Sequence, residues 1–277
     1  MNPPTVRLRL LDTGYCTASA SHVLRGAPNQ QITCHALVAL IEHPICGPVL
    51  WDTGYAPRIF EALHPWPFLL YQYATPLHLD PDLAAVSQIH ALGIDPAAIT
   101  YVIVSHFHLD HIAGLADFPQ AAIIAAADAI EHVIGVDGFA ALRRGFVPAL
   151  MPADFTRRVQ PIYRFDGPEV APFGRSHDLF GDGSLVLVQL PGHARGQIGL
   201  LAHTASGPVL LAADGAWQSR SIREQRGPGA PGYLIADNPR ELDATLAKLH
   251  QFAQAHPEVT ILPTHCPESY ALVGRTM

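Results

Sequence analysis

The strongest constraint on the fold of this chain is a run of metal-binding residue types directly after an apolar segment. Residues 101–105 read Tyr-Val-Ile-Val-Ser and are followed by His-Phe-His-Leu-Asp-His. The apolar run predicts a buried strand, and alternate side chains of the loop after it can point at one ion while the others point at a second. A coincidental polar loop is the alternative. The pattern predicts a metal site with ligands His106, His108, Asp110 and His111.

Three apolar runs later in the chain each lead to one more metal-binding residue type. The runs and residues are 185–190 with His193, 209–212 with Asp214, and 259–262 with His265. Side chains from the ends of separate strands can converge, and imidazole and carboxylate are suitable donors for zinc, iron or manganese. We therefore expect one site built from donors that are far apart in the sequence.

The rest of the chain alternates short apolar runs with amphipathic segments. Further strands are predicted at 6–11, 32–41, 49–51, 122–125 and 198–202. Helices are predicted at 80–93, 126–134 and 239–255, the first with Asp80 as its N-cap and Gly93 as its stop. Short, continuously apolar strands are typical of sheets covered by helices on one face and by a second sheet on the other. The sequence thus predicts an α/β fold.

Composition narrows the classes of function. With 277 residues, 49% hydrophobic and 15% charged, a single domain over 1–277 with a large core is expected. A net charge of −7 argues against a nucleic-acid partner. We expect no membrane partner and a cytoplasmic location, since neither a secretory signal nor a spanning apolar run is recognisable. The four cysteines are expected to be free thiols, and Cys266 to pack rather than bind metal.

Two stretches lack a regular period. Residues 64–79 form an insertion rich in Pro and aromatic residues, and residues 215–232 form a loop that combines three arginines with Gly-Pro-Gly-Ala-Pro-Gly. Loops of this length in a compact domain are often lids or binding loops. The alternatives are a contact between the copies of a homodimer for the first stretch and a solvated surface for the second.

Taken together, the motifs resemble the metallo-β-lactamase superfamily over nearly the whole chain. They occur in the superfamily's order: Asp52-Thr-Gly-Tyr55, His-x-His-x-Asp-His, Pro191-Gly-His193, Asp214 and His265. The resemblance implies an αββα sandwich of two mixed sheets flanked by helices, with two divalent metal ions, zinc first among them, at one edge. Asp52 would hold the ligand loop by hydrogen bonds, unless it only caps a turn.

The resemblance also implies a division of labour among the ligands. His106, His108 and His193 would bind the first metal, Asp110, His111 and His265 the second, and Asp214 both. Two metals that share a hydroxide make a nucleophile near neutral pH. Asp110 is expected to act as the catalytic residue that passes a proton to the leaving group. A purely structural zinc site fits less well, because such sites favour closed sets that contain cysteine.

Within the superfamily, the chain looks most like the N-acyl-homoserine lactone lactonases. True β-lactamases of this fold lack a bridging residue equivalent to Asp214. One departure concerns Trp217, because these lactonases commonly have a tyrosine at that position. An indole N–H donates one hydrogen bond but cannot exchange a proton as a phenol can. Trp217 is therefore expected either to pack or to shape a substrate pocket, together with Phe68, Tyr71 and Tyr73, while Tyr55 or Tyr233 supplies the missing hydroxyl.

These inferences predict a binuclear metal-dependent hydrolase that acts on a small-molecule substrate. A metal-bridging hydroxide would open a lactone or small ester, with acyl-homoserine lactones as candidates. A thioesterase or phosphodiesterase of the same fold is the alternative. A metal-binding regulator with vestigial activity is a third class, although lost activity usually removes a ligand and all seven are present here.

Overall fold

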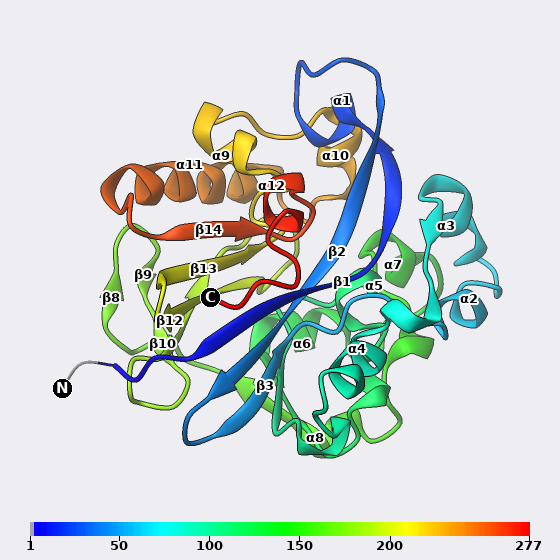
Figure 1. Cartoon of the computed structure of the whole chain (residues 1–277). Coiled ribbons are helices and arrows are strands. Elements are labelled where there is room, and N and C mark those ends of the chain that lie inside the picture. The colour runs from blue at the N-terminus through cyan, green and yellow to red at the C-terminus, as the bar shows by residue number, and fades with distance from the viewer. Residues whose placement is uncertain (1–2) are drawn as a thin grey trace.

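Two mixed β-sheets face each other, and helices cover both outer faces (Figure 1). The computed structural model describes residues 3–277. The larger sheet contains, in spatial order, β4 (Leu77–His78), β1 (Arg7–Ser19), β2 (Gln31–His43), β3 (Gly47–Trp51), β5 (Tyr101–Ile103), β6 (Ala122–Ala126) and β7 (Val159–Ile162). The smaller contains β10 (His177–Asp178), β11 (Leu185–Gln189), β12 (Ile198–Thr204), β13 (Gly207–Ala213) and β14 (Thr260–Pro263). Strands β8 (Glu169–Val170) and β9 (Gly174–Arg175) pair separately.

Most helices are short, and α11 is the long one. In chain order they are α1 (Ala20–Val23), α2 (Ile59–Ala62), α3 (Leu69–Ala74), α4 (Ala85–Ala91), α5 (Leu109–Ile112), α6 (Ala127–Val133), α7 (Gly138–Arg143), α8 (Phe155–Arg158), α9 (Ser219–Glu224), α10 (Ala230–Ile235), α11 (Pro239–Ala255) and α12 (Pro267–Tyr270). Within residues 3–277, every helix is too short or too polar to cross a bilayer.

Strand β13 shows how the sequence builds the layers. Val209 and Leu211 belong to the core between the two sheets, whereas Leu210 and Ala212 pack against the apolar stripe of α11. Successive side chains of a strand point to opposite faces, so a continuously apolar strand needs cover on both sides. This arrangement confirms the predicted αββα sandwich.

The strand order explains why the predicted ligands meet. Strands β3, β5 and β6 run parallel to one another, and β13 and β14 are parallel in the other sheet. Parallel strands end at the same edge of their sheet, which is where ligand sites occur in such folds. Consequently β13 and β14 end at one edge of the sandwich (Figure 1), and β5 ends at the same edge of its sheet as β3 and β6.

Each predicted strand is present, but one predicted helix is not continuous. Residues 80–93 form a 3-10 turn at Pro81–Leu83 and then α4, with an extended residue, Ala84, between them. The side chain of Gln88 donates hydrogen bonds to the carbonyls of Leu83 and Asp12. The bond to Leu83 uses a carbonyl that would accept a backbone N–H in a continuous helix, and the bond to Asp12 ties α4 to β1.

The two stretches without periodicity also fold into regular elements. Residues 64–79 contain α3 and β4, and residues 215–232 contain α9 and the start of α10. These helices are at most six residues long, too short to be stable alone. Contacts with the rest of the protein therefore hold them in place.

Candidate metal centre

The loop after β5 carries four of the seven predicted ligands. The chain leaves the sheet after Ile103, passes through an extended segment, and enters the single turn of α5. The extended segment separates the first two ligands by one residue, and the helical turn places the other two side by side. His106, Asp110 and His111 are buried, and His108 is half-buried.

The other three ligands come from loops of the smaller sheet. The loop after β11 carries His193 and is closed by Gln197, whose amide donates to the carbonyl of Leu190 at 3.1 Å. Its Gly192 packs on α11 so closely that an added Cβ would lie 2.0 Å from the backbone nitrogen of Leu242. The remaining two ligands directly follow the ends of β13 and β14, and they are Asp214 and His265.

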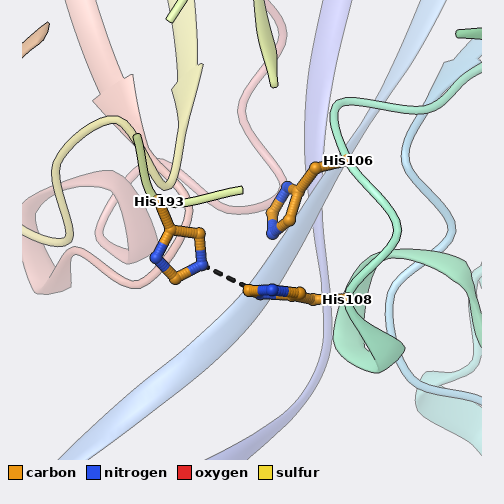
Figure 2. A group of neighbouring side chains, drawn as sticks. All are labelled: His106, His108 and His193. Carbon is orange, nitrogen blue, oxygen red and sulfur yellow. Dashed lines mark hydrogen bonds between the residues drawn. The ribbon is translucent and has the colours of Figure 1, made fainter. Parts of the chain in front are cut away.

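All seven side chains meet in three overlapping groups. In each group, one ligand atom per residue lies within 4.8 Å of the others. The groups are His106–His108–His193, His106–His111–Asp214, and Asp110–His111–His265. Figure 2 shows the first group, with rings from two distant loops turned toward one another and Nε2 of His193 2.9 Å from Nδ1 of His108.

Asp214 lies between two of these groups: His106–His108–His193, the first histidine group, and Asp110–His111–His265, the second. Its Oδ2 is 3.2 Å from Nε2 of His193 and 3.1 Å from Nε2 of His265. Its Oδ1 is 3.6 Å from Nε2 of His111. On the far side, Oδ2 of Asp110 is 3.4 Å from Nε2 of His265. One carboxylate thus reaches both groups, as a bridging ligand requires.

A buried carboxylate fixes two of the imidazoles from behind. Asp52, fully buried at φ 55°, accepts hydrogen bonds from the backbone N–H and hydroxyl of Ser105, both at 2.7 Å, and from Nδ1 of His111 at 2.8 Å. The Ser105 hydroxyl in turn accepts from Nδ1 of His106 at 3.0 Å. Since both Nδ1 atoms donate protons, both Nε2 atoms keep a lone pair for the cluster. Asp52 therefore does more than cap a turn, and Ser105 is a contributor that only its place beside the motif could have signalled.

His265 is oriented in the same way by backbone. Its Nδ1 donates to the carbonyl of His35 on β2 at 2.7 Å, which turns Nε2 toward Asp214 and Asp110. The neighbouring Cys266 does not enter the cluster. Its thiol sulfur is buried 3.3 Å from the backbone nitrogen of Ser219, consistent with the packing role expected from the sequence.

Burial sets the charge of the first histidine group. It lowers the pKa of His106 well below the usual value, with His111 and His108 adding to the effect. It likewise lowers the pKa of both His108 and His193 to about 3, although Asp214 opposes the change. These imidazoles are neutral at physiological pH, which is the form that binds metal ions.

The second group carries charge when no metal is bound. Burial opposes protonation of His111, but the carboxylates of Asp110 and Asp52 outweigh it and raise its pKa to about 9. Burial also opposes protonation of His265, and Asp214 outweighs it to give a pKa of about 10. These histidines in turn hold the pKa of Asp214 well below its usual value against burial. The carboxylates of this group thus stabilise positive charge at the site, whether it is carried by protonated histidines or by a metal ion.

The donor set fits divalent metal ions. Nε2 of His106, Nε2 of His111 and Oδ1 of Asp214 are buried and have no hydrogen-bond partner. A buried polar atom without a partner costs about 1–3 kcal/mol, so three together call for a ligand. Five imidazoles and two carboxylates suit zinc, iron or manganese, and nothing in the set distinguishes them.

A cavity of about 360 Å³ opens beside the cluster, and we call it the apolar cavity. Asp110, Asp214 and His265 form one wall. The other walls are mostly apolar or aromatic and include Cys16, Val23, Cys34, Tyr55, Tyr71, Trp217 and Ile235. A small apolar molecule can therefore contact the cluster directly.

The predicted substrate residues of the insertion divide into two sets. Tyr71 lines the apolar cavity, but Phe68 packs in the hydrophobic core and Tyr73 is 78% exposed. The predicted substrate contacts of Phe68 and Tyr73 therefore find no support in the structure. Residues two apart on a helix point about 200° away from each other, so Tyr71 and Tyr73 of α3 cannot face the same cavity.

Trp217, three residues after Asp214, is hydrogen-bonded to the carboxylate of Asp214. Nε1 of Trp217 donates to Oδ2 of Asp214 at 3.0 Å, while the indole ring lines the apolar cavity. Of the two tyrosines expected to replace the missing phenol, Tyr55 lines the apolar cavity but Tyr233 donates to Asp243 outside it. The indole thus shapes the cavity and holds a ligand, and its only donor is already used.

Comparison with known proteins identifies the class. Residues 32–265 match the family model described as the Metallo-beta-lactamase superfamily. The chain belongs to the metallo-β-lactamase superfamily, as the motifs predicted.

Its relatives narrow the class. The N-acyl homoserine lactonase AttM of Rhizobium radiobacter is 33% identical over 199 residues, which cover 70% of this chain and 68% of that protein. The probable metallo-hydrolase Rv2300c of Mycobacterium tuberculosis is 28% identical over 260 residues, covering 88% and 78%. These relationships confirm the predicted enzyme class, a metal-dependent hydrolase.

Solved structures show the same fold. An N-acyl homoserine lactone hydrolase with the product N-hexanoyl-L-homoserine at its catalytic metal centre has a TM-score of 0.73 at 18% identity, covering 98% of this chain and 96% of that chain. The dizinc quorum-quenching lactonase AidC has a TM-score of 0.68 at 16% identity, covering 96% and 90%.

Proposed function

We propose that this protein is a binuclear metal-dependent hydrolase that opens the ring of a lactone or cleaves a related small ester. The observation that carries the proposal is Asp214, whose carboxylate reaches both histidine groups at the wall of the apolar cavity. We assign the first metal to His106, His108 and His193, the second to Asp110, His111 and His265, and the bridge to Asp214. The lactonase relatives favour a lactone, with acyl-homoserine lactones as candidates.

The bound ions would supply electrophilic activation of the ester carbonyl and lower the pKa of water toward 7. The chain's own residues do the rest. Asp52 and Ser105 hold His106 and His111 in the tautomer that leaves Nε2 free. Asp110 is exposed to the apolar cavity, where its carboxylate can carry a proton to the alkoxide that leaves when the ring opens.

Tyr71 is our choice for the hydroxyl that contacts the substrate. It lines the apolar cavity with the ligand carboxylates, and burial together with Asp110 raises its pKa well above the usual value. The phenol therefore stays protonated and can donate a hydrogen bond to the ester carbonyl. This assignment gives Tyr71 the task for which the N–H of Trp217 is not free.

A rate panel on the purified, metal-loaded protein tests the proposal. The substrates are N-hexanoyl-homoserine lactone, γ-butyrolactone, an acyl thioester and bis(p-nitrophenyl) phosphate. We expect the highest kcat/KM for a lactone. A thioester or phosphodiester hydrolysed faster than both lactones would contradict the lactone assignment while leaving the hydrolase in place, and no turnover of any substrate would contradict the hydrolase.

A further inference from the structure

A second hollow adjoins the metal cluster, and its charge differs from that of the apolar cavity. It has a volume of about 280 Å³ and is lined by Arg143, Arg144, His132 and Asp237 among others. We call it the arginine cleft. His108 and His193 line both hollows, so the two meet at the proposed ligands of the first metal.

The arginine cleft is positively charged although the chain has a net charge of −7. Among residues 3–277, Arg143 and Arg144 form no ion pair with a carboxylate. The one carboxylate in the cleft, Asp237, lies 3.5 Å from Nε2 of His132. Two guanidinium groups without an acidic partner thus line the cleft beside the cluster.

Backbone contacts fix these arginines relative to the ligands. A guanidinium nitrogen of Arg144 donates to the carbonyl of His132, which ties the end of α7 to the end of α6. The next residue, Gly145, accepts a hydrogen bond of 3.1 Å from the backbone nitrogen of Leu109. A Cβ on Gly145 would lie 2.6 Å from the ring of His108, so the backbone after α7 rests directly on a ligand.

We infer that the arginine cleft binds an anionic group of the substrate, a carboxylate or a phosphate, while the ester carbonyl lies at the cluster. The inference rests on the proposed function and names its substrate class. Guanidinium groups present paired N–H donors that match the oxygens of both anions. Because the cleft opens on the proposed ligands of the first metal, an anion held there lies within reach of an ester bound at the cluster.

Three homoserine lactones test this inference. Their acyl chains have equal length and end in a methyl ester, a carboxylate or a phosphonate, so the reacting ring is constant. We would measure kcat/KM for the wild type and for Arg143→Gln and Arg144→Gln, the two arginines that line the cleft. Arg275→Gln is the matched control, because Arg275 is exposed at the far C-terminus. Thermal unfolding of each variant verifies that it folds.

We expect the wild type to prefer a charged chain over the methyl ester by at least about ten-fold, since a hydrogen bond to a charged group is lost with the ester. Arg143→Gln and Arg144→Gln should each reduce that preference, and Arg275→Gln should not. The better of the two charged chains identifies the anion.

Two failures are distinguishable. Equal turnover of all three lactones, or a preference that both arginine variants retain, would overturn this inference and leave the lactonase standing. No turnover of any of the three would overturn the proposed function, and the inference would fall with it.

Discussion

The metal cluster and the segments that cover it are built in different ways. Each cluster ligand directly follows a strand or lies in one tight loop. Ser105 holds His106, Asp52 holds His111, and the carbonyl of His35 holds His265. The covering segments, residues 64–79 and 215–232, are short helices without a stable period of their own. From this difference we propose that the fold sets the metal chemistry and that the covering segments select the substrate.

The largest effect should come from the ligand that joins both histidine groups. Asp214→Ala should abolish lactone turnover and reduce the metal content, because it removes a donor from both metals at once. Elemental analysis and kcat/KM provide the measurement, with the exposed Asp166→Ala as the control. Wild-type turnover with metal lost would show that the cluster is not the catalytic site.

A smaller loss of metal affinity or activity should follow from a substitution at Asp52, which supports a ligand and does not bind metal itself. Asp52→Asn presents an amide N–H to Nδ1 of His111 and so disfavours the tautomer that leaves Nε2 free. We expect metal affinity or activity to fall by roughly 10- to 100-fold. Competition with a metal chelator measures the affinity. Unchanged affinity would mean that hydrogen bonds to Asp52 are not needed to hold the ligands. The contrast between an anchored metal cluster and loosely built covering segments would then not hold.

The metal-free cluster should make stability depend on pH. His111 and His265 have folded-state pKa values raised to about 9 and about 10, above the unfolded value of about 6.5. Protonation therefore stabilises the metal-free fold fully below about pH 6.5, and this contribution is lost as the pH rises through 9 to 10.

Urea unfolding of metal-free and metal-loaded protein at pH 6, 7.5 and 9 measures this dependence. We expect the free energy of unfolding of the metal-free protein to fall by on the order of a few kcal/mol over that range. The metal-loaded protein should change less, because its imidazoles carry no proton to lose. Rising stability of the metal-free protein would contradict the assigned charges.

The smallest effect on kcat/KM is expected from Tyr71 of the covering helix α3, compared with its neighbour Tyr73. Tyr71→Phe removes the hydroxyl from the apolar cavity and should lower kcat/KM for lactones by roughly 2- to 10-fold, the value of one neutral hydrogen bond. Tyr73→Phe, on the exposed side, is the matched control and should change nothing. Equal effects of both changes would argue against a substrate contact by Tyr71.

The same contrast explains what could be predicted from the sequence. That the seven candidate ligands meet could be predicted, because strand ends are visible as apolar runs and parallel strands bring their ends to one edge. Helix α11 was predictable from its length and its buried stripe of Leu242, Leu246 and Leu249.

The covering segments were not predictable in detail. Whether an aromatic residue in residues 64–79 faces the apolar cavity depends on where α3 docks, and composition does not encode this. The sequence predicted substrate contacts equally for Phe68, Tyr71 and Tyr73, yet Phe68 lies in the core and Tyr73 in solvent. The arginine cleft escaped notice because Arg143 and Arg144 lie far from His193 in the chain. The homodimer and the cytoplasmic location stay predictions.

Stepwise addition of zinc to metal-free protein, with lactone hydrolysis followed at each step, tests the central claim most directly. Two donor sets bridged by Asp214 predict that activity rises until about two equivalents per chain are bound and then stays constant. Full activity after one equivalent, or no activity after two, would contradict a binuclear centre formed by these seven side chains.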